Sequence, residues 1–228
     1  VRVIYNGIDT ESWHPVSDDD FLASVGIDPS RPSVVFVGRI TRQKGLPYLL
    51  RAAERLPKDV QLILCAGAPD TPEIMAEVQE LVRGLQATRD GVVWIDRLLP
   101  RNELCAILTS ATTFVCPSVY EPLGIVNLEA MACGAAVVGT ATGGIPEVVV
   151  DGVTGRLVPI EQVQDGTGTP VDPERFVSDL ARVLTEVVTD ADAARAYGRA
   201  GRQRAIDDFS WAAIAETTAA LYAEVTGK

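Results

Sequence analysis

Short apolar runs rich in β-branched residues alternate, between residues 33 and 160, with segments whose apolar positions recur at helical spacing. The apolar runs predict six strands, at residues 33–38, 60–67, 92–96, 112–118, 135–141 and 155–160. Helical spacing follows each of the first four runs, over residues 44–56, 71–88, 100–111 and 124–134. This regular alternation predicts an α/β fold built on a parallel sheet with helices on both faces.

The remainder of the chain is less regular. Residues 18–20 are three consecutive aspartates, which we interpret as a solvated connector and not as a cation site. Residues 160–174 are rich in Gly, Asp, Thr and Pro, which predicts a surface loop or, as a second interpretation, part of a face that meets another domain or subunit. Beyond this loop, Ala-rich helical spacing predicts a helical tail.

Composition argues against several classes of function. The 228 residues carry a formal net charge of -11, which opposes binding to nucleic acid or to an anionic membrane surface, since both need clustered Lys and Arg. No apolar run approaches the roughly 20 residues that span a bilayer. The amino end VRVIYNGID does not have the layout of a signal peptide. We therefore expect a soluble, cytoplasmic protein with no membrane span.

Histidine and cysteine usage argues against a metal or thiol site. The single histidine, His14, rules out a histidine cluster and gives little support to a Ser/His/Asp arrangement. The four cysteines form no CxxC pair and lie in apolar segments, which predicts buried thiols in a reducing compartment: Cys65, Cys105, Cys116 and Cys133. We expect neither a metal ion nor a cofactor.

Residues suited to an anion follow the predicted strands. In a parallel sheet ligands bind beyond the carboxyl ends of the strands. In GRITRQKG, residues 38–45, Gly38 permits close backbone approach, Arg39 presents a planar fork and Lys44 a point charge, which together suit a diphosphate. Two surface cations in a turn would explain the same residues equally well in isolation. PLGI and GGIP add a helix amino end and backbone N–H groups, so the combination favours a phosphate site.

The stretch EPLGIVNLE, residues 121–129, carries a carboxylate at each end. A helix starting near Pro122 would place Glu129 roughly 12 Å along the axis from Glu121. Acidic residues near a helix start and on its surface would account for a lone pair of this kind. Because carboxylates accept hydrogen bonds from vicinal hydroxyls, and the anion features lie at the same edge, we interpret the pair as ligands of a sugar and of a ribose. The predicted ligand is a nucleotide diphosphate sugar.

The E-x7-E pair, the GRxxxxKG segment and the GGIPE turn together resemble the carboxyl-terminal, donor-binding domain of the retaining GT-B glycosyltransferases of family 4, over nearly the whole chain. The loop at residues 160–174 is most similar to that of the actinobacterial-type glycogen synthases of this family, which include enzymes that make maltose 1-phosphate. The resemblance implies a Rossmann-like core at residues 33–160, an inter-domain entry segment at residues 1–32, and a loop with carboxyl-terminal helices at residues 161–228. It also implies an amino-terminal acceptor domain that this sequence lacks.

Site roles follow from the resemblance residue by residue. Arg39 and Lys44 match the pair that binds the diphosphate and stabilises the departing nucleotide without a metal ion. Glu121 matches the ligand of the donor sugar, and Glu129 matches the ligand of the ribose. The remaining donor-binding positions, with the base contacts at the turn after the third strand, are Gly38, Arg97, Leu98, Leu123, Gly124 and Ile125.

The resemblance implies transfer of glucose from ADP-glucose to an α-1,4-glucan or to glucose 1-phosphate, with the acceptor held by the other domain. The isolated chain is then expected to bind ADP-glucose weakly and not to transfer glucose. Three alternatives remain open from the residues: a family 4 enzyme with a different nucleotide sugar, a nucleotide-sugar epimerase of similar fold, and a non-catalytic nucleotide-sugar-binding module.

Overall fold

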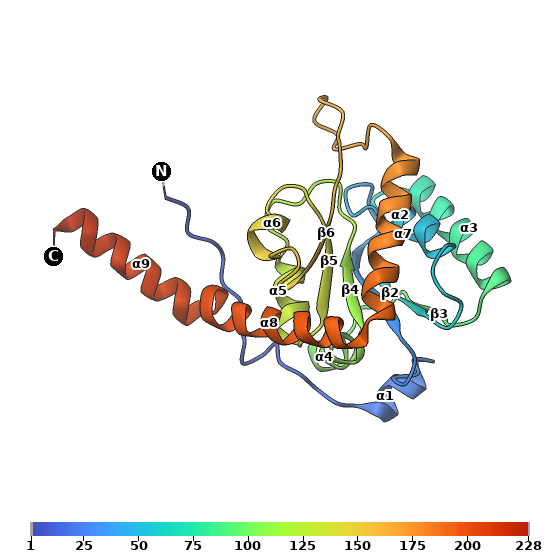
Figure 1. Cartoon of the computed structure of the whole chain (residues 1–228), viewed down its shortest axis with the longest axis horizontal. Helices are drawn as coiled ribbons and strands as arrows, with labels where there is room; N and C mark the ends of the chain where they lie inside the picture. The colour runs from blue at the N-terminus through green and yellow to red at the C-terminus, as the bar shows by residue number, and fades with distance from the viewer. Residues whose placement is uncertain (1, 228) are drawn as a thin grey trace.

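A six-stranded parallel sheet forms the centre of the computed structural model, which describes residues 2–227 (Figure 1). Its strands are β1 (Ser33–Arg39), β2 (Gln61–Gly67), β3 (Val92–Ile95), β4 (Thr113–Cys116), β5 (Ala136–Thr140) and β6 (Gly155–Val158). They lie in the order β3-β2-β1-β4-β5-β6, and every neighbouring pair is parallel. The predicted strands are confirmed. Because the order reverses between β1 and β4, the crevice that receives ligands in such sheets lies beyond these two strands.

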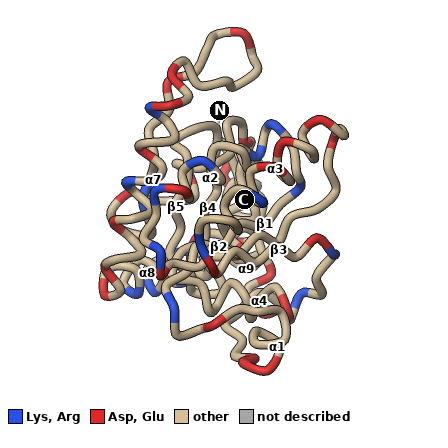
Figure 2. The backbone as a smooth tube through the Cα atoms, turned by 90° about the vertical axis from the view of Figure 1, so that its right-hand side faces the viewer, with Lys and Arg blue, Asp and Glu red and all other residues tan. Residues whose placement is uncertain are grey.

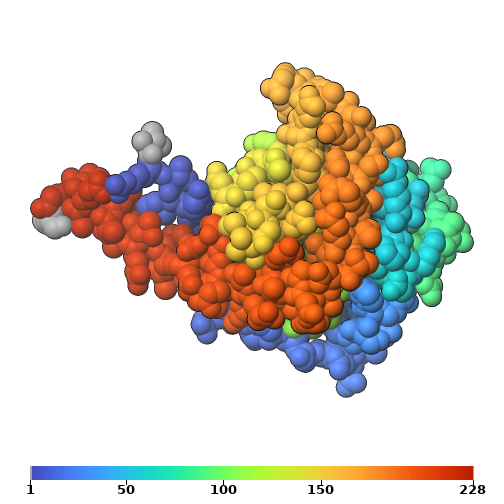
Figure 3. All heavy atoms as spheres, viewed as in Figure 1, coloured from blue at the N-terminus to red at the C-terminus, as the bar shows by residue number. Residues whose placement is uncertain are grey.

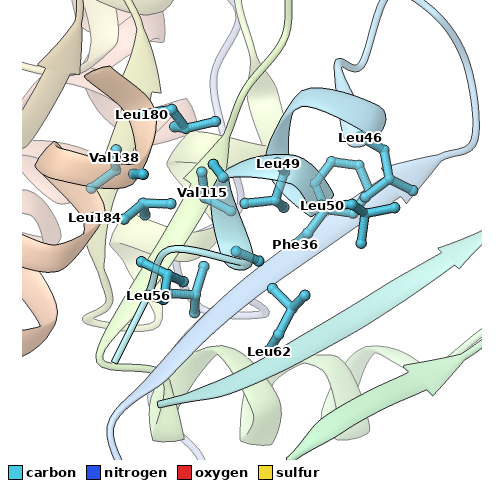
Figure 4. Close-up of a cluster of buried hydrophobic side chains, with 14 of the residues drawn as sticks. Phe36, Leu46, Leu49, Leu50, Leu56, Leu62, Val115, Val138, Leu180 and Leu184 are labelled. Atoms are coloured by element: carbon cyan, nitrogen blue, oxygen red, sulfur yellow. The ribbon is translucent and has the colours of Figure 1, made fainter. Parts of the chain in front are cut away.

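Helices cover both faces of the sheet, as the sequence predicts. They are α1 (Asp19–Ser24), α2 (Leu46–Ala53), α3 (Pro72–Thr88), α4 (Arg101–Ser110), α5 (Ile125–Ala132), α6 (Ile145–Val148), α7 (Pro173–Thr189), α8 (Ala191–Phe209) and α9 (Trp211–Thr226). Successive side chains of β1 point to opposite faces: Val34 and Phe36 pack with α2, α3 and α7, whereas Val35 packs with residues of α4, α5 and α8. Figure 4 shows the first of these two cores, in which Phe36 contacts the apolar face of α2.

Two local expectations were wrong. Asp19 and Asp20 are exposed, as expected, but residues 18–20 are not a connector: they open α1, because the Asp18 side chain accepts a hydrogen bond from the Phe21 amide at 3.0 Å and caps the helix. Helix α5 begins at Ile125 and not near Pro122, since its N-cap Gly124 has φ 83°, in the left-handed region. Glu121 therefore lies four residues ahead of α5, and the estimate of its distance from Glu129 along one helix does not apply.

The Gly- and Pro-rich stretch after β6 forms a hairpin, which we define as residues 161–171. The Val163 amide donates to the Thr169 carbonyl at 2.9 Å, and the Val171 amide donates to the Glu161 carbonyl at 2.8 Å. The hairpin projects from the body of the molecule (light orange in Figure 3). It is thus a surface excursion, but one with its own hydrogen-bonded structure.

The helical tail is confirmed and is joined to the start of the chain. The Ile8 amide donates to the Phe209 carbonyl at 2.7 Å, and the Trp211 amide donates to the Ile8 carbonyl at 3.2 Å. Helix α8 packs on α5 and β5, whereas α9 extends away from the sheet (Figure 1). Within residues 211–226 only Ile214 is buried.

The distribution of charged residues and the burial of the cysteines agree with the expectations from composition. Figure 2 shows Lys and Arg scattered over several helices and loops. Among residues 2–227, no helix combines the length and apolar character that a membrane crossing requires. The four cysteines are unpaired and buried, as predicted, and burial raises the pKa of Cys65 to about 12.

Candidate functional site

A cavity of about 310 Å³ opens at the carboxyl ends of β1, β2 and β3. Its lining is largely apolar and includes four of the predicted site residues: Gly38, Arg39, Arg97 and Leu98. Leu98 is 97% exposed, and Arg97 pairs with Glu103 of α4 at 2.6 Å. An apolar floor with two guanidinium groups at its edge suits a flat aromatic group attached to an anion.

Lys44 and Glu121 form a buried ion pair at the crevice. Lys44 Nζ lies 2.6 Å from Glu121 Oε2, and the two side chains are only 21% and 9% exposed. Ser118 Oγ donates a second, longer hydrogen bond of 3.4 Å to the same carboxylate oxygen. Because either charge would be costly to bury without its partner, the two side chains stay paired in this position. The structure thus brings together two of the three residues predicted to act in catalysis.

Two loops position this pair. We call residues 39–45, after β1, the cation loop, and residues 117–124, between β4 and α5, the carboxylate loop. The Val119 amide donates to the Gln43 carbonyl, and Gln43 Nε2 donates to the Tyr120 carbonyl, both at 2.9 Å. Gly45 has φ 67°, and a Cβ there would lie 2.0 Å from the Pro117 carbonyl oxygen, so only glycine permits this approach. The two loops therefore form one packed unit.

The GGIP turn packs against the carboxylate loop. The Gly144 amide donates to the Glu121 carbonyl at 2.8 Å, and a Cβ at Gly143 would lie 2.0 Å from that carbonyl oxygen. The Gly144 amide is therefore already engaged, and α6, which follows, has only four residues. The expectation that this turn presents free N–H groups to an anion is wrong for Gly144. The glycines are needed because the turn lies directly on the backbone that carries Glu121.

Arg39 lies apart from the buried pair. Its guanidinium contacts Asp70 at 3.2 Å, and the two side chains are 63% and 49% exposed. An exposed pair of this kind contributes little to stability, so the guanidinium can leave Asp70 at small cost. Arg39 is therefore available to an anionic ligand in the cavity that it lines.

Glu129 lies on α5 and is only partly exposed. Burial raises its pKa to about 7, and the nearby charge of Arg101 only partly opposes this effect. A carboxyl group that titrates near neutral pH is a common property of functional sites. Of the remaining predicted positions, Leu123 is half-buried, Gly124 is buried and Ile125 is exposed.

Asn127 lies on α5 between the predicted positions Ile125 and Glu129, and the sequence analysis gave it no role. Its side chain is fully buried, and among residues 2–227 neither Nδ2 nor Oδ1 has a hydrogen-bond partner. Gly124 has φ 83°, which favours glycine at the start of α5, and a Cβ there would lie 2.3 Å from Nδ2 of Asn127. The position of Asn127 as the one polar residue inside an apolar run was the available signal.

The chain is similar to known proteins over nearly its whole length. The family described as "Glycosyl transferases group 1" matches residues 31–190. Over 99% of its length the chain is 53% identical to an alpha-maltose-1-phosphate synthase of Mycolicibacterium smegmatis and 54% identical to one of Mycobacterium tuberculosis. It spans 57% of the length of each of these relatives. Among solved structures, the sucrose-phosphate synthase of Thermosynechococcus elongatus superposes with a TM-score of 0.78 at 30% identity, over 99% of this chain and 53% of that one.

Proposed function

The chain belongs to the group 1 glycosyl transferases, and we propose that it is the donor-binding half of a retaining glucosyltransferase that uses ADP-glucose. The observation that carries this proposal is the identity of more than half of the residues, over nearly the whole chain, with alpha-maltose-1-phosphate synthases. Glucose 1-phosphate is the acceptor that this likeness favours, and an α-1,4-glucan is the second candidate. The acceptor would be held by the part of such enzymes that this chain does not span.

We assign the segments of the chain accordingly. Residues 33–160 form the core that binds the donor, and residues 1–32 lead into it from the acceptor domain. Residues 161–228 form a loop and carboxyl-terminal helices, of which α7 and α8 pack on the core. The bonds between Ile8 and the junction of α8 with α9 support this division, because they tie the entry segment to the tail.

Each side chain of the site has a role in the proposed reaction. Arg39 and Lys44 bind the diphosphate and stabilise the negative charge that develops on it as the bond to the anomeric carbon breaks. Glu121 accepts hydrogen bonds from the glucose hydroxyls, and Glu129 accepts them from the ribose. Arg97 and Leu98 border the cavity that takes the base. The acceptor hydroxyl attacks the face from which the nucleotide departs and gives its proton to the leaving phosphate oxygen, so the configuration is retained.

Calorimetric titration with three nucleotide sugars tests the proposal. We expect ADP-glucose to bind at least about tenfold more tightly than UDP-glucose or GDP-mannose, a difference of about 1.4 kcal/mol. Tighter binding of one of the other two would show that the base or the sugar is assigned wrongly. A chain that binds none of the three would contradict the donor-binding role itself.

The Arg39→Ala variant tests the diphosphate contact. We expect it to weaken ADP by about 1.5 to 3 kcal/mol, because a charge-assisted hydrogen bond to phosphate is lost, while adenosine binds as before. The unfolding free energy should hardly change, since the pair with Asp70 is exposed. Arg42→Ala is the matched control, because Arg42 belongs to the same loop, is 69% exposed and pairs with Glu77. Equal weakening of ADP and adenosine would refute the assignment.

A further inference from the structure

The Gln162 side chain joins three separate segments of the molecule. Its Nε2 donates to the Val119 carbonyl of the carboxylate loop at 2.6 Å and to the Gly168 carbonyl of its own hairpin at 2.7 Å. Its Oε1 accepts a hydrogen bond from Thr142 Oγ1 at 3.0 Å. Thr142 begins the turn whose Gly144 amide holds the Glu121 carbonyl. One amide group thus connects the hairpin, the carboxylate loop and the turn after β5.

The backbone of the hairpin packs closely against the carboxylate loop. Gly168 has φ 75°, and a Cβ there would lie 2.5 Å from the Val119 carbonyl oxygen. The hairpin backbone therefore lies directly against the carboxylate loop, two residues from Glu121. Thr167 and Thr169 bond to each other at 2.8 Å on either side of Gly168, which fixes the tip of the hairpin. These contacts give the hairpin a defined conformation, although it projects from the body of the molecule.

The opposite side of the carboxylate loop is held by the cation loop. Gln43 contacts residues 119 and 120 through two hydrogen bonds. The segment that carries Glu121 is therefore clamped between Gln43 on the diphosphate side and Gln162 on the hairpin side. The proposed reaction assigns ligand contacts to the cation loop, which carries Gln43. It assigns none to the hairpin, which carries Gln162.

We propose that Gln162 is a positioning residue for Glu121, and that the hairpin is a clasp that fixes the carboxylate loop in the orientation that recognises the transferred sugar. The inference rests on the proposed function for the identity of the ligand. It goes beyond that function because it assigns the hairpin and Gln162 to selection of the sugar and not to binding of the nucleotide.

The chemistry of the amide makes the proposal specific. Two carbonyl oxygens face Nε2, so this position requires a donor, whereas Oε1 accepts from a hydroxyl that also rotates to donate. Gln162→Ala removes the contacts, but Gln162→Glu places a carboxylate against the carbonyls of Val119 and Gly168. The Glu variant, although closest in shape, should therefore be the more damaging of the two. Gln164→Ala is the matched control, because Gln164 is an exposed residue of the same hairpin whose amide donates to the Gln162 main-chain carbonyl at 3.2 Å and leaves the Gln162 side chain in place.

Calorimetry with ADP-glucose and ADP on these variants is the first arm of the test. We expect Gln162→Ala to weaken ADP-glucose by about tenfold, the effect of losing roughly one well-made hydrogen bond. ADP should change by less than about twofold. Gln162→Glu should weaken ADP-glucose further, and Gln164→Ala should change neither ligand. A purely structural role would weaken both ligands together, and that result, or unchanged binding of both, would overturn the proposal.

Amide hydrogen exchange without ligand is the second arm. The amides of Val119 and Gly144 hold the carboxylate loop on its two sides, so both should exchange faster in Gln162→Ala while the strand amides stay protected. Unchanged exchange would overturn the clasp even if the chain binds ADP-glucose as proposed. Faster exchange in a chain whose wild type binds no sugar nucleotide would support the clasp and reject the proposed function, so the two failures are distinguishable.

Discussion

Replacement of Lys44 by Met is expected to lower the unfolding free energy by about 3 kcal/mol, because it leaves the Glu121 carboxylate buried without its cation. Met keeps the apolar stem that packs near Gly38 and removes only the charge. The same variant should weaken ADP and ADP-glucose by about 1.5 to 3 kcal/mol, since the charge-assisted contact to phosphate is lost. Chemical denaturation and calorimetry measure the two effects separately.

A double variant distinguishes the loss of the ion pair from a general loss of stability. In Lys44→Met with Glu121→Gln, no uncompensated charge remains, so most of the lost stability should return while binding of the sugar nucleotide stays weak. Lys58→Ala is the control, because Lys58 is an exposed lysine whose amino group donates to the Thr88 carbonyl and not to a carboxylate of the site. If the single Lys44 variant is as stable as the wild type, the ion pair seen here does not contribute to the folded state.

Replacement of Glu129 by Gln is expected to stabilise the protein at pH 8. Burial raises the pKa of Glu129 from the usual 4.5 to about 7, so folding favours its neutral form. The contribution of Glu129 to the free energy of unfolding is therefore at its maximum below pH 4.5, and it is lost as the pH rises through 7. At roughly 1.4 kcal/mol for each pH unit, a permanently neutral Gln should gain about 3 kcal/mol above pH 7 and nothing near pH 4. Denaturation curves across this range measure the difference.

The same variant should bind the donor less well. At pH 8 the ionised Glu129 is a strong acceptor for the ribose hydroxyls, and we expect its loss to weaken ADP and ADP-glucose alike by about tenfold. ADP-glucose is the better ligand for the pH series, because its diphosphate is esterified at both ends and stays charged. The gap between wild type and variant should narrow below pH 7, where the wild-type carboxyl becomes protonated.

Glu80→Gln provides the comparison for both measurements, since Glu80 is an exposed glutamate of α3. It should alter neither the pH dependence of stability nor the affinity for ADP-glucose. A Glu129 variant whose stability gain is the same at pH 4 and pH 8 would mean that this carboxyl is not held neutral by burial.

Much of the fold was predictable because its signals are local. Alternation at a period of two and apolar spacing at a period of 3.6 depend on residues a few positions apart, so the six strands and the main helices could be derived from the chain alone. The rule that ligands bind beyond the carboxyl ends of parallel strands then directed attention to Arg39, Lys44 and Glu121. Their residue types, charge and positions along the chain needed no coordinates.

Contacts between distant segments needed the assembled sheet. Lys44 and Glu121 are 77 positions apart, and nothing in either neighbourhood indicates that they form one buried pair. The start of α5 was misplaced because Gly124, the N-cap residue, has a left-handed conformation, and the helix begins only at Ile125. Gln162 looked like one more polar residue in a loop, although its amide joins three segments.

The class of fold, the order of its elements and the chemical groups at the edge of the sheet could therefore be derived from the order of the residues. Which of these groups are paired, which backbone groups are already engaged and which carboxyl group is desolvated depend on the packed structure. Propensity and periodicity act over a few residues, whereas desolvation and close backbone approach depend on what packs around a group. Burial in the folded chain is the main cause of the raised pKa of Glu129, about 7, and the charge of Arg101 partly opposes it.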